Sequence, residues 1–139
     1  MRDQQRPTAR YTTPPSVEDI VALADRAFAA VPPRLRRHVG NVSIAVEEIP
    51  DDETLDELGI ESAWDLSGLY RGTPLNRRSV ADVAPGPDLI FLYRQPILLE
   101  WIETDVDLYR LVRNVLVHEI AHHFGFSDAE IEALEQQTD

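Results

Sequence analysis

The sequence contains no cysteine and no lysine, and its only methionine is Met1. Without cysteine there can be no disulfide framework, no thiolate metal site and no cysteine nucleophile. All 13 strongly basic residues are therefore arginines, and they face 25 acidic residues. The resulting formal net charge of −12 repels phosphate backbones, so nucleic acid is not an expected partner.

Long apolar runs are also missing from the chain. No stretch approaches about 18 consecutive apolar residues, so no transmembrane helix and no membrane partner are predicted. Residues 1–7 lack the apolar core of a secretory signal peptide. These absences favour a cytoplasmic location. The oligomeric state is unknown from the sequence.

The length bounds the number of domains. A chain of 139 residues with 43% hydrophobic content can bury one modest core, and no second domain fits. Residues 1–15 are polar and contain Pro7, Pro14 and Pro15, so we expect a disordered N-terminal arm there. Residues 16–139 are then expected to form a single domain.

Hydrophobic periodicity predicts both helices and strands. A first helix is expected to start at Ser16, with Asp19 as an acidic cap partner, and to stop at residues 32–33. Alternating or compact apolar runs predict three short strands, at residues 42–46, 66–70 and 89–93. The acidic segment from residue 47 to 61 lacks the spacing and glycine of a calcium loop. We expect it to be a solvated loop with a helical turn.

The last third of the chain is expected to be helical. A short helix is predicted over residues 96–103. Thr104 is expected to cap a second, central helix over residues 105–124, with acidic residues in its first turn. Apolar residues lie nearly all round this helix, which is typical of an element buried between a sheet and other helices. A short capped helix is predicted over residues 128–136.

The central helix carries a pattern typical of a metal site. His118 and His122 are four residues apart, so they lie on one face and can point at one metal ion. Glu119 lies about 100° round the helix, beside the pair, where the general base of a zinc hydrolase belongs. The competing interpretation is a buried helix whose histidines are satisfied by hydrogen bonds, but the full constellation favours metal binding.

Catalytic zinc usually takes three protein ligands, and Asp128 is the candidate for the third. Gly125 suits a helix C-terminus, so the chain can turn there and bring Asp128 back towards the metal. A capping box formed by Ser127 and Glu130 is a second, compatible reason for an aspartate in this first turn. His123 has the chemistry of a ligand, but it lies about 100° from His122 and is interpreted as supporting or packing.

With these residues the chain resembles the small bacterial zincin-like metallopeptidases, which carry an extended His-Glu-x-x-His-x-x-Gly-x-x-Asp signature on a minimal zincin fold. The resemblance is strongest over residues 115–128 and extends to residues 68–75 and 88–93. The larger metzincin clan adds a methionine turn beneath the metal, which this chain cannot form because its only methionine is Met1. This departure favours the minimal family.

The resemblance implies an α+β fold in which a small mixed sheet packs on a central active-site helix with flanking helices. It implies one Zn²⁺ per chain, with His118, His122 and Asp128 as ligands and Glu119 as the catalytic base. The implied activity is hydrolysis of a peptide or protein substrate by zinc-activated water. An edge strand of such folds pairs with extended substrate, and residues 89–93 are the candidate for it. The alternative for these residues is an interior strand.

Two questions stay open in the sequence. The residue that stabilises the oxyanion could be Tyr70, Arg71, Tyr93 or His123, and the sequence does not choose among them. The alternative function is a non-catalytic, zinc-stabilised protein-interaction module, which the small size and the absent methionine turn favour. A closed four-ligand site without exchangeable water would distinguish that module from an enzyme.

Overall fold

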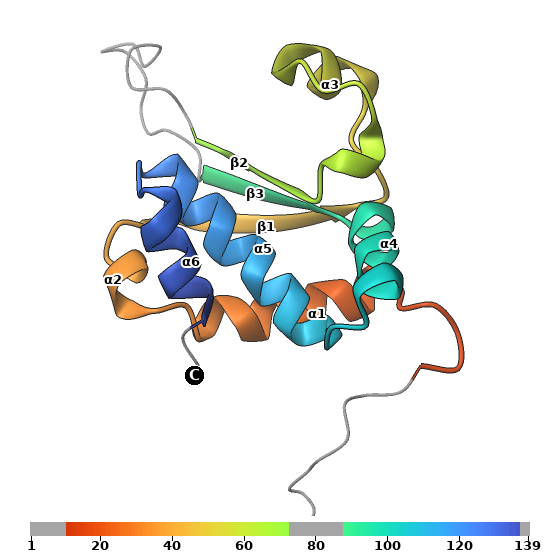
Figure 1. Cartoon of the computed structure of the whole chain (residues 1–139), viewed down its shortest axis with the longest axis horizontal. Helices are drawn as coiled ribbons and strands as arrows, with labels where there is room; N and C mark the ends of the chain where they lie inside the picture. The colour runs from red at the N-terminus through yellow and green to blue at the C-terminus, as the bar shows by residue number, and fades with distance from the viewer. Residues whose placement is uncertain (1–10, 73–87, 137–139) are drawn as a thin grey trace, which may run out of the picture.

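The computed structural model describes residues 11–72 and 88–136, which form a small sheet and the helices packed around it (Figure 1). In chain order the elements are α1 (Val17–Ala29), α2 (Pro33–Arg36), β1 (Val42–Glu47), α3 (Asp52–Leu58), a 3-10 turn η1 (Ala63–Asp65), β2 (Gly68–Arg71), β3 (Asp88–Tyr93), α4 (Arg94–Thr104), α5 (Leu108–His123) and α6 (Asp128–Gln136). The expected α+β class is confirmed.

The sheet has the strand order β1-β3-β2. β1 runs parallel to β3, with Ile44 opposite Ile90, and β2 runs antiparallel to β3, with Tyr70 opposite Ile90. The predicted mixed sheet is therefore confirmed. The interpretation of residues 89–93 as the edge strand is wrong, because β3 pairs on both sides and β2 occupies an edge among the described strands.

The run of large apolar residues in β3 explains this correction. A strand that is paired along both edges lies inside the sheet and can read as a continuous hydrophobic run, whereas an edge strand can be shorter and more polar. Ile90 and Leu92 are fully buried. β2 contains only four residues and ends in the exposed Arg71.

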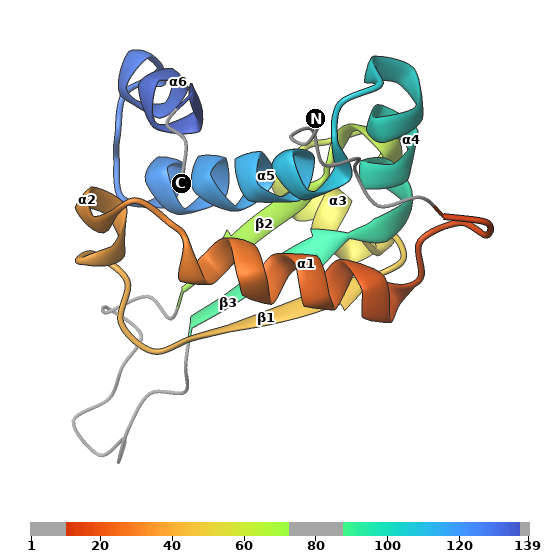
Figure 2. The ribbon, with the colours of Figure 1, turned by 90° about the horizontal axis from the view of Figure 1, so that it is seen from below.

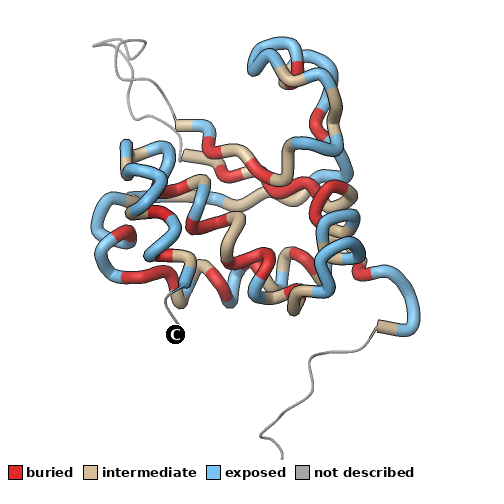
Figure 3. Tube along the Cα trace, viewed as in Figure 1, coloured by how far each residue is buried: buried red, intermediate tan, exposed pale blue. Residues whose placement is uncertain are grey.

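Two long helices cover one face of the sheet. Figures 1 and 2 show α1 and α5 lying side by side, with α1 over β1 and α5 over β2. α6 packs along α5, and α4 packs against one end of it. α3 lies beyond the sheet from α1 and is mainly exposed (Figure 3). The central helix is thus held on several sides, as its all-round apolar pattern predicts.

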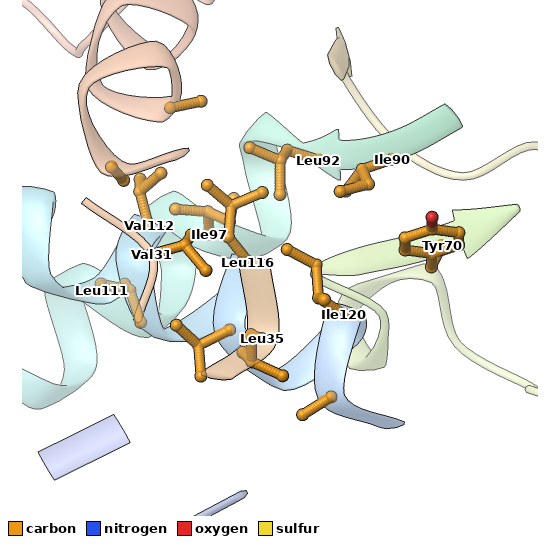
Figure 4. Close-up of a cluster of buried hydrophobic side chains, with 14 of the residues drawn as sticks. Val31, Leu35, Tyr70, Ile90, Leu92, Ile97, Leu111, Val112, Leu116 and Ile120 are labelled. Carbon is orange, nitrogen blue, oxygen red and sulfur yellow. The ribbon is translucent and has the colours of Figure 1, made fainter. Parts of the chain in front are cut away.

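The core is built around α5. Six of its apolar side chains are 4% exposed or less, namely Leu111, Val112, Leu116, Val117, Ile120 and Ala121. Figure 4 shows Leu116 and Ile120 between Leu35 and the sheet residues Ile90 and Leu92. A helix that is packed into the core in this way is a rigid support for functional side chains.

The start of α1 follows the predicted capping box. The backbone N–H of Ser16 donates to Asp19 Oδ2 at 2.8 Å, and the N–H of Asp19 donates to Ser16 Oγ at 3.1 Å. Each side chain thereby satisfies a backbone donor that the first turn leaves without a helical partner. The helix ends at Ala29, shortly before the two prolines.

The start of the central helix differs from the sequence prediction. Thr104 is the last residue of α4, and its hydroxyl donates to the Glu100 carbonyl at 2.7 Å. Asp105 closes α4 in the left-handed conformation with φ 58. Asp107 is the true N-cap of α5, accepting the N–H of Arg110 at 3.1 Å. The helix therefore begins at Leu108, not at residue 105.

The acidic segment contains more helix than expected. α3 extends over seven residues, starting where Asp51 accepts the N–H of Thr54 at 2.8 Å. It ends at Gly59, which adopts the left-handed conformation with φ 71. These are standard start and stop signals, and the density of negative charge masked them in the sequence.

The predicted arm of residues 1–15 lies mostly outside the described residues. Of its described part, the Tyr11 ring packs edge-on against Trp101, with centroids 5.9 Å apart. The Pro15 carbonyl accepts from Arg94 Nε at 2.6 Å. Within the described ranges, no helix is long and apolar enough to cross a membrane.

Replacing Leu116 by alanine tests the role of α5 as the centre of the core. Because its side chain is 0% exposed, we expect Leu116→Ala to lower the free energy of unfolding by about 2–5 kcal/mol. Urea denaturation of both proteins measures the change. Ile102→Ala is the control, since that side chain is 73% exposed and should cost far less. Equal losses for the two variants would contradict the core assignment.

Candidate metal centre

His118 and His122 lie next to one another near the C-terminal end of α5. Their rings are nearly parallel, with an interplanar angle of 14° and centroids 6.1 Å apart. Both residues are exposed, although α5 is otherwise largely buried. Two neighbouring imidazoles that face solvent are accessible to a metal ion, as the spacing predicts.

Glu119 lies on the side of α5 that faces β2 and is half-buried. Burial raises the pKa of its carboxyl group above the ordinary value. Positive charge on His118 and His122 opposes this rise, and so does a hydrogen bond donated by the backbone N–H of Tyr70. Burial dominates, so the carboxyl group is a stronger base than an exposed glutamate.

Gly68 allows β2 to come this close to α5. A Cβ at position 68 would lie 2.7 Å from Val115 Cγ1, 3.3 Å from Glu119 Cγ and 3.2 Å from the Phe91 carbonyl oxygen. No side chain larger than hydrogen fits there unless the neighbouring atoms move. The sequence analysis did not single out Gly68, because its role arises from packing between distant segments and leaves no local pattern.

His123 packs away from the histidine pair, in agreement with its interpretation as a packing residue. Its ring stacks on Tyr70, with centroids 4.0 Å apart and an interplanar angle of 18°. Gly72 leaves room for this ring, since a Cβ there would lie 3.2 Å from His123 Nε2. His123 and Tyr70 therefore join the end of β2 to the end of α5.

The four oxyanion candidates all have other contacts. The Tyr70 hydroxyl donates to Asp88 Oδ2 at 2.8 Å, and burial together with this carboxylate raises its pKa. Arg71 pairs with Glu57 at 3.2 Å. Tyr93 is 2% exposed and stacks with Phe91. With His123 against Tyr70, these contacts favour none of the four, and the choice stays open.

Asp128 is exposed and is the first residue of α6. Gly125 turns the chain with φ 82, and the predicted capping box forms between Ser127 and Glu130, at 2.8 and 3.1 Å. Across residues 11–72 and 88–136, however, no three histidine, aspartate or glutamate side chains gather as a metal-binding group. The assignment of Asp128 as third ligand stays a prediction, which requires its carboxylate to turn towards the pair.

Three other side chains of α5 precede the pair of His118 and His122 on the same helix. Leu111, about two turns before His118, is buried, and Val115 is half-buried against Gly68. Asn114 Oδ1 is buried and, within the described part of the chain, has no hydrogen-bond partner. Leaving such an acceptor unsatisfied costs about 1–3 kcal/mol.

A carboxylate that the sequence analysis missed contacts the first histidine. Glu135 Oε2, on α6, lies 3.5 Å from His118 Nδ1. The two residues are separated by a turn and most of a second helix, so no local spacing signals the contact. Only the antiparallel packing of α6 along α5 brings them together.

A comparison with protein-family models matches residues 39–138 to the family described as zincin-like metallopeptidase. This match includes the whole sheet, α5 and α6, and therefore every candidate site residue. No curated protein matches the chain.

Placing a methyl group at Gly68 tests the close packing of β2 on α5. We expect Gly68→Ala to lower the free energy of unfolding by about 1–3 kcal/mol, because the new Cβ overlaps Val115. Val115→Ala should cost less in the Gly68→Ala background than in the wild type, since it makes room for the methyl group. Urea denaturation of the four proteins gives this coupling energy.

Gly40→Ala is the matched control, because nothing lies within 4 Å of a Cβ at that position and its φ is not positive. It should change stability little. Strictly additive effects of Gly68→Ala and Val115→Ala would show that the two positions are not in steric contact.

Proposed function

Because the chain belongs to the zincin-like metallopeptidase family, we propose that it is a zinc-dependent peptidase with its active site on α5. In this proposal His118, His122 and Asp128 hold one zinc ion, and Glu119 is the general base. The observation that carries it is the arrangement on one helix: two accessible, neighbouring imidazoles beside a half-buried carboxylate.

The donor set fits zinc. Two imidazole nitrogens and one carboxylate oxygen form a known three-ligand combination for catalytic zinc, leaving a position open for water. Both histidines come from one rigid helix, which fixes their separation. Asp128 follows on the next helix, close enough in sequence for its side chain to complete the set. Other first-row divalent metals accept the same ligands, so zinc is favoured by the family rather than by the donors alone.

Zinc in this position would supply Lewis acidity, both to a water molecule and to the scissile carbonyl. Glu119 would take the proton of the attacking water and deliver it to the leaving amine. Its raised pKa suits both transfers, because a base works best when its pKa approaches the working pH. The Tyr70 N–H would hold the carboxylate in place while it exchanges this proton.

β2 is the proposed support for the substrate. It is an edge of the described sheet, and its backbone lies directly beside Glu119 at Gly68 and Tyr70. An extended peptide added to this edge would be held by backbone hydrogen bonds near the base. The proposed substrates are therefore peptides or unfolded protein segments that can adopt an extended conformation.

Metal content tests the ligand assignment. We expect about one zinc ion per chain in the wild-type protein, little or none in His122→Ala and reduced binding in Asp128→Ala, because each variant removes one of only three ligands. Elemental analysis after purification without added metal, followed by titration with zinc, measures both quantities.

His123→Ala is the matched control, since it removes a neighbouring histidine that packs against Tyr70. It should keep its zinc. Zinc lost from His123→Ala and retained by His122→Ala would overturn the ligand assignment. A wild-type protein that takes up no metal at neutral pH would remove the basis of the proposed function.

Replacing Glu119 by glutamine tests the general base. We expect Glu119→Gln to keep zinc while cleavage of a quenched-fluorescence peptide library falls by about 10²–10⁴-fold, because glutamine cannot accept the proton. Glu103→Gln, an exposed glutamate at the end of α4, is the control and should cleave like the wild type. Unchanged cleavage by Glu119→Gln would contradict the assignment of Glu119 as the general base.

The alternative is a zinc-stabilised module that binds a protein partner without cleaving it. The small size of the chain and the absence of a methionine that could form a methionine turn favour it. Such a module would bind zinc through four protein ligands and show no exchangeable water on the metal. Relaxation of water protons with a paramagnetic metal substituted for zinc would separate the two functions.

A further inference from the structure

Glu135 reaches the first of the two histidines from a different helix. Its Oε2 lies 3.5 Å from His118 Nδ1, and its side chain is 28% exposed while that of His118 is 49% exposed. This separation is longer than the 2.7–3.2 Å or so of a good hydrogen bond, so a shift of about 0.5 Å would close it. The contact joins the last turn of α6 to the face of α5 that carries the proposed ligands.

The backbone of Glu135 is fixed by the same helix that carries His118. Arg113 is 4% exposed, and its Nη1 donates to the Glu135 carbonyl oxygen at 3.3 Å. Ile131 and Leu134, at 3% and 1% exposure, precede Glu135 on α6 and anchor the helix in the core. Arginine is rarely buried unless its guanidinium group has polar partners. The buried Arg113 therefore does more than fill space, because it holds the end of α6 beside a predicted ligand.

A carboxylate at Nδ1 has a defined consequence for an imidazole. Neutral histidine carries one proton, either on Nδ1 or on Nε2. An acceptor beside Nδ1 favours the form with the proton there, which leaves the lone pair on Nε2. It also restricts rotation of the ring and strengthens the remaining nitrogen as a donor to a metal.

We propose that Glu135 is a positioning residue that orients His118, accepting its Nδ1–H so that Nε2 is presented to the metal. Arg113 contributes by holding the Glu135 backbone in register with α5. The inference rests on the proposed function in so far as it takes His118 to be a ligand. Glu135 itself does not bind the metal.

The first test uses metal-free protein and needs no activity. Long-range ¹H–¹⁵N spectra, recorded at a pH of about 8.5, distinguish the two tautomers of His118. We expect the Nδ1–H form in the wild type and a shift towards Nε2–H in Glu135→Ala. Glu135→Gln keeps an acceptor oxygen of the same reach and should retain most of the Nδ1–H form.

Glu132→Ala is the control for both tests, because it removes an exposed glutamate from the same helix. It should leave the tautomer and the zinc affinity unchanged. A wild-type tautomer in Glu135→Ala would overturn the proposal, provided that its circular dichroism matches that of the wild type. If the alanine variant folds poorly, Glu135→Leu takes its place, because leucine removes the acceptor oxygen while filling a similar volume. A wild-type tautomer of His118 in a folded Glu135→Leu protein would overturn the proposal in the same way.

The second test is zinc affinity, measured by competition with a chromophoric chelator. We expect Glu135→Ala to bind zinc about 10–100-fold more weakly than the wild type, and Glu135→Gln to lose less. A loss as complete as that of His122→Ala would identify Glu135 as a ligand and overturn the positioning role. Zinc binding to Glu135→Ala at the wild-type affinity would overturn it as well.

The two tests separate this inference from the proposed function. If the wild-type protein binds no zinc, the proposed function fails, while the tautomer of His118 in metal-free protein still reports whether Glu135 orients it. If the wild type binds zinc and cleaves peptides but neither measurement responds to Glu135→Ala, the proposed function stands and the role of Glu135 fails.

Discussion

The rest of the site depends on the close approach of β2 to α5 at Gly68. Because Gly68 has no side chain, Val115 and Glu119 can pack directly on the strand backbone. This proximity lets the Tyr70 N–H reach the Glu119 carboxylate, and it buries the carboxylate enough to raise its pKa. A larger residue would separate the strand from the helix, removing the hydrogen bond and the burial together. One missing side chain therefore controls both the position and the basicity of the proposed base.

Two different elements pack against α5, and each contacts a different residue of the proposed site. β2 contacts the side of Glu119, while α6 contacts the side of His118 through Glu135. α6 is itself held by Arg113 and by its buried Ile131 and Leu134. The histidines lie between these two supports and stay exposed. A rigid helix with a supporting element on each side satisfies the requirement that a metal site be held before the metal arrives.

The sequence predicted what local patterns determine. The two capping boxes at Ser16 and Ser127 were confirmed because each is closed by residues three positions apart. The start of α5 was placed wrongly because Thr104, Asp105 and Asp107 are all good capping residues, and only the packing of α4 against η1 and α5 chooses among them. The position of β3 in the sheet, like the contacts of Gly68 and Glu135, depends on segments far apart in the chain. No local period encodes such pairings.

The proposed third ligand differs from the histidines in what fixes it. The backbone positions of His118 and His122 are fixed by the largely buried, sixteen-residue helix α5. The backbone position of Asp128 depends on a short turn at Gly125. The capping box that could have explained an aspartate here is formed by Ser127 and Glu130, and it does not use the Asp128 carboxylate. The cap therefore fixes the backbone of Asp128 while leaving its side chain to rotate about its own χ angles. A carboxylate in the first turn of a helix gains about 0.3–1 kcal/mol from the helix dipole wherever it points. That energy is the same whether the carboxylate faces solvent or a metal ion. In the proposed site, binding of the ion would therefore decide whether Asp128 joins the two histidines.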